Sequence, residues 1–332
     1  MYNQLGDYTA PQDPAHIITM REGLEEAGAR VTYVKGCAVR DTRTSQIGEA
    51  VRAARQADVV VAVVGGSSAR DFRTKYIDTG AAVVDENSVS DMEAGEGFDR
   101  STLDLLGLQL PLLEALKATG KPLVVVYIEG RPLNKNWAAD KADALLTLWY
   151  PGGEGGKALA DVLLGRYNPA GRLAVSVPRS VGQLPVYYNR KVPFSHDYVE
   201  ESAEPLYPFG YGLSYTSFAY DNLICHPEEP KATKDLMVTV DVTNTGERDG
   251  DEVVQVYIRD LVASTARPRK QLCAFSRVHV KAGETVTVEL PLARSAFELV
   301  NPAMERVVEP GEFEIQVGAS SQDIRLSETI AL

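Results

Sequence analysis

The sequence predicts two domains of different class, an α/β domain with a mostly parallel sheet followed by an all-β sandwich. Helix and strand patterns alternate from about residue 14 to 165, which indicates a parallel sheet covered by helices. From about residue 235 to 330, short strand patterns are separated by turn signals, which indicates antiparallel strands. With 332 residues, 44% of them hydrophobic, the chain is long and apolar enough for two cores.

The α/β pattern begins with two helices and two strands. We expect a helix over 15–27, a strand over 29–34 (ARVTYV), a short helix over 47–56 and a strand over 59–64. The last strand is an unbroken apolar run, rich in β-branched valine, which is typical of a strand buried on both faces of a parallel sheet.

The pattern continues with a helix, two strands and a final helix. The run 108–120 (LQLPLLEALKATG) predicts a helix that stops at Gly120. Strands are expected over 121–130 (KPLVVVYIEG) and 143–150 (DALLTLWY), and a helix over 154–165 (EGGKALADVLLG). Because helices connect successive strands throughout, the sheet should be mostly parallel.

The C-terminal part alternates apolar and polar residues in short runs. We expect strands within 236–246, 252–260, 276–283, 284–292 and 312–321. The preceding residues 168–234 are rich in Pro, Tyr and Gly, and we expect an ordered connecting segment because so many aromatic rings would be costly to leave in water. The predicted domains are therefore 1–167 and 235–332, joined by 168–234.

Composition excludes several classes of function. The formal net charge is -12 and no basic run is present, which argues against a nucleic acid or an anionic membrane as partner. No apolar run is long enough to span a bilayer, and the N-terminal MYNQLGDYTAPQ lacks an export signal. Cys37, Cys225 and Cys273 are expected to be free thiols, the histidines are scattered, and we expect no cofactor and no metal.

A long acidic loop follows the strand 59–64. It runs from about residue 65 to 106, much longer than a usual connection, and such loops are normally functional. Its last part, GEGFDR, places glycines on both sides of Glu96, while Asp99 and Arg100 could pair to fix the base of the loop. The alternative is a solvated acidic loop in which Ser101 or Asp104 merely caps the next helix.

Two glycine-rich stretches do not predict nucleotide sites. VVGGSS, which follows the strand 59–64, lacks the G-x-G-x-x-G spacing of a dinucleotide site. PGGEGG, at 151–156, lacks the Lys-Ser/Thr ending of a phosphate-binding loop and is better explained as a tight turn from strand to helix.

Three long motifs carry a resemblance to a known family. They are GEGFDRSTLDLLGLQLPLLEALKATGKPLVVVYIEGRPL, YPGGEGGKALADVLLGRYNPAGRLAVSVPRSVGQLPVYYN and PLYPFGYGLSYTSF. In this order they resemble the C-terminal portion of the glycoside hydrolase family 3 β-glucosidases and β-xylosidases. The resemblance covers nearly the whole chain from Gly6 onward. It implies an α/β sandwich with flavodoxin-like layers, a fibronectin type III-like domain, and a TIM-like barrel that would precede residue 1.

The resemblance also implies an activity. Members of this family are retaining exo-glycosidases that use a barrel carboxylate as nucleophile and a carboxyl of the α/β sandwich domain as general acid/base. Their acid/base glutamate, in an (S/G)-E-G-(F/Y) stretch before Asp-Arg, maps onto Glu96, with Glu93 as runner-up. Asp99 and Arg100 would support the loop. Ser90-Asp91-Met92 is similar to the family's Ser-Asp-Trp nucleophile motif only by coincidence, because it lies within the loop.

The expected partners follow from this resemblance. They are a β-linked oligosaccharide or glycoside, and a catalytic barrel that is a separate or removed polypeptide, with no nucleic acid and no membrane. A periplasmic or extracellular location is favoured by the resemblance. The alternative function is a non-catalytic carbohydrate-binding or scaffold module.

Overall fold

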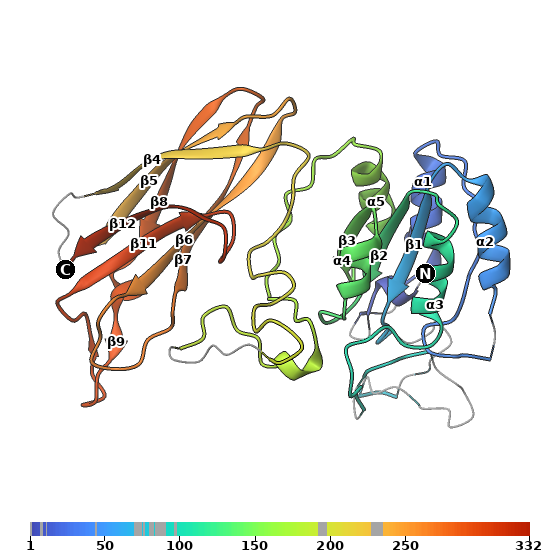
Figure 1. Ribbon diagram of the computed structural model, residues 1–332, viewed down its shortest axis with the longest axis horizontal. Coiled ribbons are helices and arrows are strands. Elements are labelled where there is room, and N and C mark those ends of the chain that lie inside the picture. Colours follow the sequence, from blue (N-terminus) through green and yellow to red (C-terminus); the bar gives the residue numbers. More distant parts are fainter. Residues whose placement is uncertain are drawn as a thin grey trace. The chain divides into compact units, whose positions relative to one another are not determined.

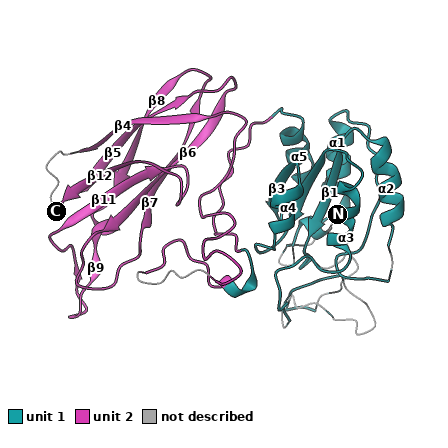
Figure 2. Cartoon of the chain, in the orientation of Figure 1, with its two compact units in different colours: residues 1–166, 179–182 teal, residues 167–178, 183–332 magenta. Residues whose placement is uncertain are grey.

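Two compact units make up the protein in a computed structural model (Figure 2). Unit 1 takes in residues 1–166 and 179–182, and unit 2 takes in residues 167–178 and 183–332. The predicted domain limits 1–167, 168–234 and 235–332 stay a prediction. The structure describes residues 2–6, 9–10, 12–43, 45–69, 75, 77–79, 83, 91–95, 98–191, 198–226 and 235–332.

Unit 1 contains a parallel sheet in the order β1-β2-β3 (Figure 1). Its strands are β1 (Val60–Gly65), β2 (Leu123–Ile128) and β3 (Ala144–Trp149). The register aligns Val60 with Leu123 and Val124 with Ala144, so all three strands point the same way. The predicted parallel sheet and its three strands are confirmed.

Helices cover both faces of this sheet. Because successive strand residues point to opposite faces, Val125 and Tyr127 of β2 face one helix layer and Val126 and Ile128 face the other. The first layer is α2 (Ile47–Gln56), α3 (Gln109–Lys117) and α4 (Asn136–Lys141). The second is α1 (Met20–Glu26), whose N-terminus is capped by Thr19 and Glu22, and α5 (Gly155–Leu163).

Three details of the first half differ from expectation. The helix expected over 15–27 is shorter, because a 3-10 turn, η2 (Pro14–His16), precedes α1. The strand expected over 29–34 is absent, since no ladder of backbone hydrogen bonds forms there. The strand β1 is also not buried on both faces, because Val63 is 42% exposed.

Unit 2 contains a sandwich of two antiparallel sheets, in the orders β12-β11-β6-β7 and β4-β5-β8 (Figure 1). Alternate residues of both sheets form one apolar core, as the pattern in Leu236–Asn244 illustrates. The all-β fold class predicted for this part is confirmed. The strands are β4 (Phe218–His226), β5 (Leu236–Asn244), β6 (Gly250–Asp260), β7 (Gln271–Val280), β8 (Thr285–Leu292), β11 (Glu312–Gly318) and β12 (Ile324–Ala331).

Short elements complete the description. A small ribbon pairs β9 (Leu299–Val300) with β10 (Arg306–Val307). The remaining 3-10 turns are η1 (Tyr2–Gln4), η3 (Val181–Gln183) and η4 (Arg294–Phe297).

Aromatic stacking orders the described residues between Tyr188 and Tyr211. The rings of Tyr188 and Phe209 stack at 4.2 Å between centroids, and those of Tyr207 and Tyr211 at 5.1 Å. Tyr188 also meets Tyr257 of β6 edge-on at 6.0 Å. These rings therefore belong to the packing of unit 2 instead of a flexible linker.

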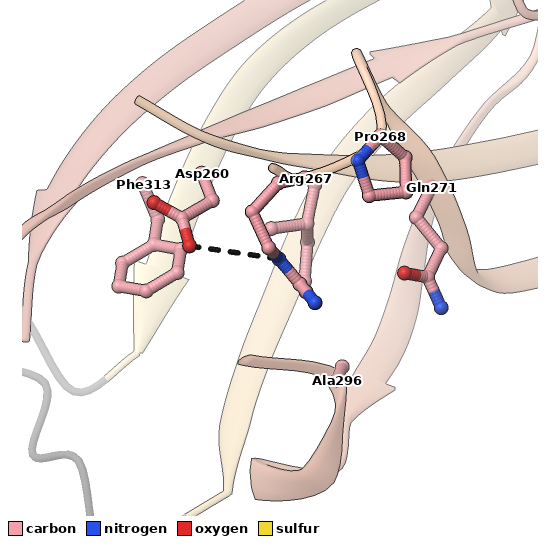
Figure 3. A pocket seen from close by; sticks show the side chains of 7 residues that line it. Asp260, Arg267, Pro268, Gln271, Ala296 and Phe313 are labelled. Carbon is pink, nitrogen blue, oxygen red and sulfur yellow. Dashed lines mark ion pairs between the residues drawn. The ribbon is translucent and has the colours of Figure 1, made fainter. Parts of the chain in front are cut away.

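A small pocket lies beside β6 in unit 2 (Figure 3). Asp260 and Arg267 face each other there, with 3.7 Å between Oδ2 and Nε. Burial raises the pKa of the Asp260 carboxyl, and the charge of Arg267 opposes this. The other walls are Ile258, Pro268, Gln271, Ala296 and Phe313. None of the residues that the sequence singled out lies here, so the candidate site is in unit 1.

Candidate functional site

The carboxyl ends of β1, β2 and β3 lie at the same edge of the sheet, which is where open α/β sheets bind ligands. Three loops leave this edge, and the loop after β1 contacts both of the others. The Ser68 hydroxyl, after β1, donates to the Tyr150 hydroxyl, after β3, at 2.9 Å. Gly130, after β2, allows this approach, because a Cβ there would lie 2.6 Å from the Tyr150 oxygen. The tips of the three strands are thus held together.

Glu93 enters this edge beside the end of β1. Its backbone N–H donates to the carbonyl of Ser67 at 2.8 Å. Gly66 makes room for its side chain, because a Cβ on Gly66 would lie 1.8 Å from Glu93 Oε1. A larger residue at position 66 would therefore displace the carboxylate.

An ion pair with Arg100 holds the Glu93 carboxylate. Arg100 Nη1 lies 2.5 Å from Glu93 Oε2, and the two side chains are only 3% and 5% exposed. Burial raises the pKa of the Glu93 carboxyl, and the positive charge of Arg100 opposes that rise. Arg100 also donates to the carbonyls of Thr102 and Asp104. Through these contacts it joins Glu93, at the start of the segment 93–104, to the residues at the end of that segment.

Asp99 has a different partner. Its Oδ1 lies 2.8 Å from Arg131 Nη2, in the loop after β2, and it also accepts from the backbone N–H of Arg100 at 2.7 Å. The hydrogen bond from Arg131 is the main reason why the pKa of the Asp99 carboxyl lies below its usual value. The expected pairing of the Asp99 and Arg100 side chains is therefore wrong, because each binds another residue.

Glu96 lies outside the described residues. Its described neighbours in the chain are tied together, since Gly95 N–H donates to Phe98 C=O at 3.1 Å and Phe98 N–H donates back at 3.3 Å. Asp91, just before the segment, accepts from the backbone N–H groups of Val39 and Arg40 at 2.9 and 3.1 Å.

The simple capping role expected for Ser101 or Asp104 is wrong. The next helix, α3, begins at Gln109 and has no side-chain cap. Asp104 instead accepts hydrogen bonds from the side chains of Thr102 and Asn134, at 2.9 and 2.8 Å. It therefore joins the end of this segment to the loop after β2.

A buried ion pair shapes the loop after β2, and the sequence reasoning missed it. Lys135 Nζ lies 2.6 and 2.7 Å from the two carboxylate oxygens of Glu129, and the side chains are 2% and 1% exposed. Leu133 N–H and the Thr147 hydroxyl also donate to Glu129. Burial lowers the pKa of the Lys135 ammonium, and Glu129 opposes this. The sequence feature that could have revealed this pair is the charged run Glu-Gly-Arg at 129–131, directly after the apolar strand β2.

These contacts give the edge a defined architecture. Asp91 and Glu93 anchor one flank of Gly95 and Phe98, and Asp99 and Arg100 anchor the other. Among the described residues, no group of three His, Cys, Asp or Glu side chains could hold a metal ion. No described helix is both long and apolar enough to cross a bilayer.

Comparison with known proteins gives a consistent result. Residues 1–215 match the glycosyl hydrolase family 3 C-terminal domain, and residues 252–321 match the fibronectin type III-like domain. A β-xylosidase of Formosa agariphila is 39% identical over 328 residues, which cover 97% of this chain and 42% of the relative. A periplasmic β-glucosidase of Salmonella typhimurium is 38% identical, with 97% and 43% covered.

Solved structures agree with the fold. The structure of a β-glucosidase from Erythrobacter marinus superposes with a TM-score of 0.83 at 35% identity, and the match covers 100% of this chain and 45% of that one. The chain thus corresponds to the C-terminal portion of longer proteins and spans less than half of their length.

Proposed function

Because the chain belongs to glycosyl hydrolase family 3, we propose that it is the C-terminal part of a retaining exo-β-glycosidase. The substrates would be terminal, non-reducing β-linked glucose or xylose units. The relatives named as β-glucosidase and β-xylosidase support this substrate class. The chain would supply the general acid/base, and a barrel domain outside this chain would supply the nucleophile.

The observation that carries this proposal is the double anchoring of the segment around Gly95 and Phe98. The segment is held at the carboxyl edge of the sheet by Glu93 on one side and by Asp99 on the other. A loop fixed at both flanks can present one side chain with little loss of entropy, which is what positioned catalysis needs. A solvated acidic loop would not require buried anchors.

We assign the acid/base role to Glu96 and keep Glu93 as runner-up. The described contacts of Glu93 support this order, because its carboxylate is buried and paired with Arg100. A general acid must reach the glycosidic oxygen and exchange its proton with it. Glu93 would have to break the ion pair to do so, and its role is then to anchor the segment.

The proposed chemistry needs two carboxyl groups on opposite sides of the anomeric carbon, about 5 to 5.5 Å apart in retaining enzymes. In the first step, Glu96 protonates the leaving oxygen while the barrel carboxylate forms a bond to the anomeric carbon. In the second step, Glu96 takes a proton from water, which displaces the carboxylate. This chain contributes one half of the pair, so it should be inactive alone.

The test compares Glu96→Gln and Glu93→Gln in the longer enzyme. Glu96→Gln should lower kcat/KM by about 100-fold or more on alkyl or disaccharide substrates, which need a proton, and far less on dinitrophenyl glycosides, which do not. Azide should restore turnover of dinitrophenyl substrate by Glu96→Gly. Glu93→Gln is the matched control and should affect both substrate types equally.

Four outcomes separate the hypotheses. If Glu93→Gln alone shows the dependence on the leaving group, the assignment passes to the runner-up. If each variant loses the same factor in kcat/KM on both substrate types, and azide does not restore turnover, the result would contradict an acid/base on this segment. Turnover by the 332-residue chain alone would refute the split of the carboxylate pair between two domains. If the longer protein binds glycans in calorimetry but does not hydrolyse them, the result would support a binding module.

A further inference from the structure

The loop that follows β2, residues 129–135, holds two carboxylates of the acidic segment. Arg131 Nη2 lies 2.8 Å from Asp99 Oδ1. The side-chain amide of Asn134 donates to Asp104 Oδ1 at 2.8 Å. We call residues 129–135 the support loop, because this loop binds the acidic segment through two separate side chains.

Asn134 is the main junction between the two loops. Its backbone N–H donates to the carbonyl of Leu103 at 2.7 Å, and its side-chain oxygen accepts from the N–H of Asn136, the first residue of α4, at 2.9 Å. The carbonyl of Asn134 accepts from the hydroxyl of Tyr127, on β2, at 3.2 Å. The side-chain amide thus uses a donor and an acceptor at once, which fixes its orientation toward the acidic segment.

The buried ion pair of Glu129 and Lys135 joins the two ends of the support loop. Lys135 Nζ also lies 4.5 Å from the centre of the Tyr127 ring and donates to the carbonyl of Leu133 at 3.3 Å. Glu129 accepts from the backbone N–H of Leu133 at 3.0 Å. A loop closed by buried contacts at both ends holds the side chains between them in one place.

The two carboxylates that the support loop holds are both bonded to Arg100. The backbone N–H of Arg100 donates to Asp99 Oδ1 at 2.7 Å, and its guanidinium donates to the carbonyl of Asp104. The same guanidinium pairs with Glu93. Burial is the main influence on the pKa of the Glu93 carboxyl and raises it, while the charges of Arg100 and then Arg131 lower it. The support loop therefore reaches Glu93 through one intermediate residue.

The ends of the long loop are fixed separately. The side-chain amide of Gln109 accepts from the N–H of Gly65 at 2.7 Å and donates to its carbonyl at 2.9 Å. The same nitrogen donates to the carbonyl of Val39 at 2.9 Å. These contacts fasten the two ends of the loop, but its part near Asp99 and Asp104 lies where the support loop holds it.

We propose that Arg131 and Asn134 are positioning residues for the acid/base carboxyl of the acidic segment. Their action on the reaction passes through Asp99 and Asp104, which set where the segment lies at the carboxyl edge of the sheet. A displacement of about 1 Å can lower the rate of a positioned reaction about 100-fold, so such supports matter for the rate. The inference rests on the proposed function, but not on which glutamate of the segment is the acid/base.

Dependence on the leaving group tests this role in the longer enzyme. Arg131→Met and Asn134→Ala should each lower kcat/KM about 10-fold on alkyl or disaccharide substrates and less than about 3-fold on dinitrophenyl glycosides, because only the former need a well-placed proton donor. A lysine can also pair with Asp99, so Arg131→Lys should recover most of the loss. Lys117→Met is the matched control and should change neither rate, because the Lys117–Asp143 pair in the same unit has similar exposure, 34% and 51% against 37% and 60%.

A double-mutant cycle tests whether Arg131 acts through Asp99. Asp99→Asn should reproduce the loss seen in Arg131→Met. The combined variant should lose no more than about 2-fold beyond either single change, because each change already breaks the same contact. Losses that multiply in the combined variant would contradict this route.

Hydrogen exchange in the 332-residue chain gives a readout that does not need activity. In Arg131→Met/Asn134→Ala, the N–H groups of Gly95 and Phe98 should exchange about 10-fold faster, while those of β2 keep their rates. Lys117→Met should leave all of these rates unchanged. Unchanged exchange at Gly95 and Phe98 in the double variant would overturn the inference.

The outcomes separate this inference from the proposed function. If Glu96→Gln or Glu93→Gln shows the leaving-group dependence but the Arg131 and Asn134 variants do not, the positioning role is wrong and the proposed function stands. If neither glutamate variant shows it, the proposed function fails and the positioning role fails with it. Equal losses on both substrate types together with a lower Tm would show a role in stability alone, which would also overturn the inference.

Discussion

The buried Glu93–Arg100 ion pair allows a quantitative prediction about stability. Replacing Arg100 by Met removes the charge that compensates Glu93 but keeps an unbranched side chain of similar length. Both side chains are almost inaccessible, so water cannot take over the role of the guanidinium. Breaking a buried pair in this way typically costs about 3 to 5 kcal/mol, and we expect this loss in the free energy of unfolding at pH 7.

The pH dependence identifies the cause. Burial already raises the pKa of Glu93, and loss of Arg100 should raise it further. A carboxyl with a higher pKa in the folded state binds more protons when folded, so the stability of Arg100→Met should rise as the pH falls from 7 toward about 4.3, the usual value for glutamate. The wild-type protein, in which Arg100 is present, should show less of this recovery.

Urea unfolding followed by circular dichroism measures these differences. Adding Glu93→Gln to Arg100→Met removes the uncompensated charge and should recover at least about 2 kcal/mol of the loss at pH 7. The double variant should also lose the extra pH dependence. A loss below about 1 kcal/mol for Arg100→Met, or a loss that does not change with pH, would refute the view that this pair is buried and coupled.

Two further predictions follow from the described contacts. Lys135→Met should lower the free energy of unfolding by about 3 to 5 kcal/mol in the same urea assay, because it leaves Glu129 buried without its partner. The double variant Glu129→Gln/Lys135→Met should recover part of this loss. If the losses of the two single variants simply add in the double variant, the pair is not coupled. The thiol of Cys225 is buried, and its pKa is raised to about 12, mainly by desolvation. A disulfide reagent at pH 8 should therefore leave it unmodified until the protein is unfolded. Rapid modification of the folded protein, detected by mass spectrometry, would contradict that burial.

Local patterns were sufficient to predict most strands and the fold class. The valine-rich run of β1, the alternation in β5 and the turn signals of unit 2 all act within a few residues. Residues 31–34 show where such patterns fail. Their composition favours a strand, but a strand exists only when a partner supplies hydrogen bonds, and composition does not reveal whether that partner is present.

The candidate site was predicted less completely. The acidic segment stood out because of its length and its glycines. Glu93, Asp99 and Arg100 were also singled out, but their partners were not, since Arg131 comes from a different loop and the pairing is set by the tertiary fold. Arg100 pairs with the buried carboxylate of Glu93, seven positions away, while the adjacent Asp99 pairs with Arg131.

The amide of Gln109 has a consequence for how such proteins can diverge. Gly65 is the last residue before the long acidic loop, and Gln109 is the first residue of the helix after it, so one side chain fastens the two ends of the loop to each other. When the ends are fastened, each doubling of the length between them adds only about 0.6 kcal/mol of closure entropy. A change in the length of this loop should therefore cost the sheet little stability.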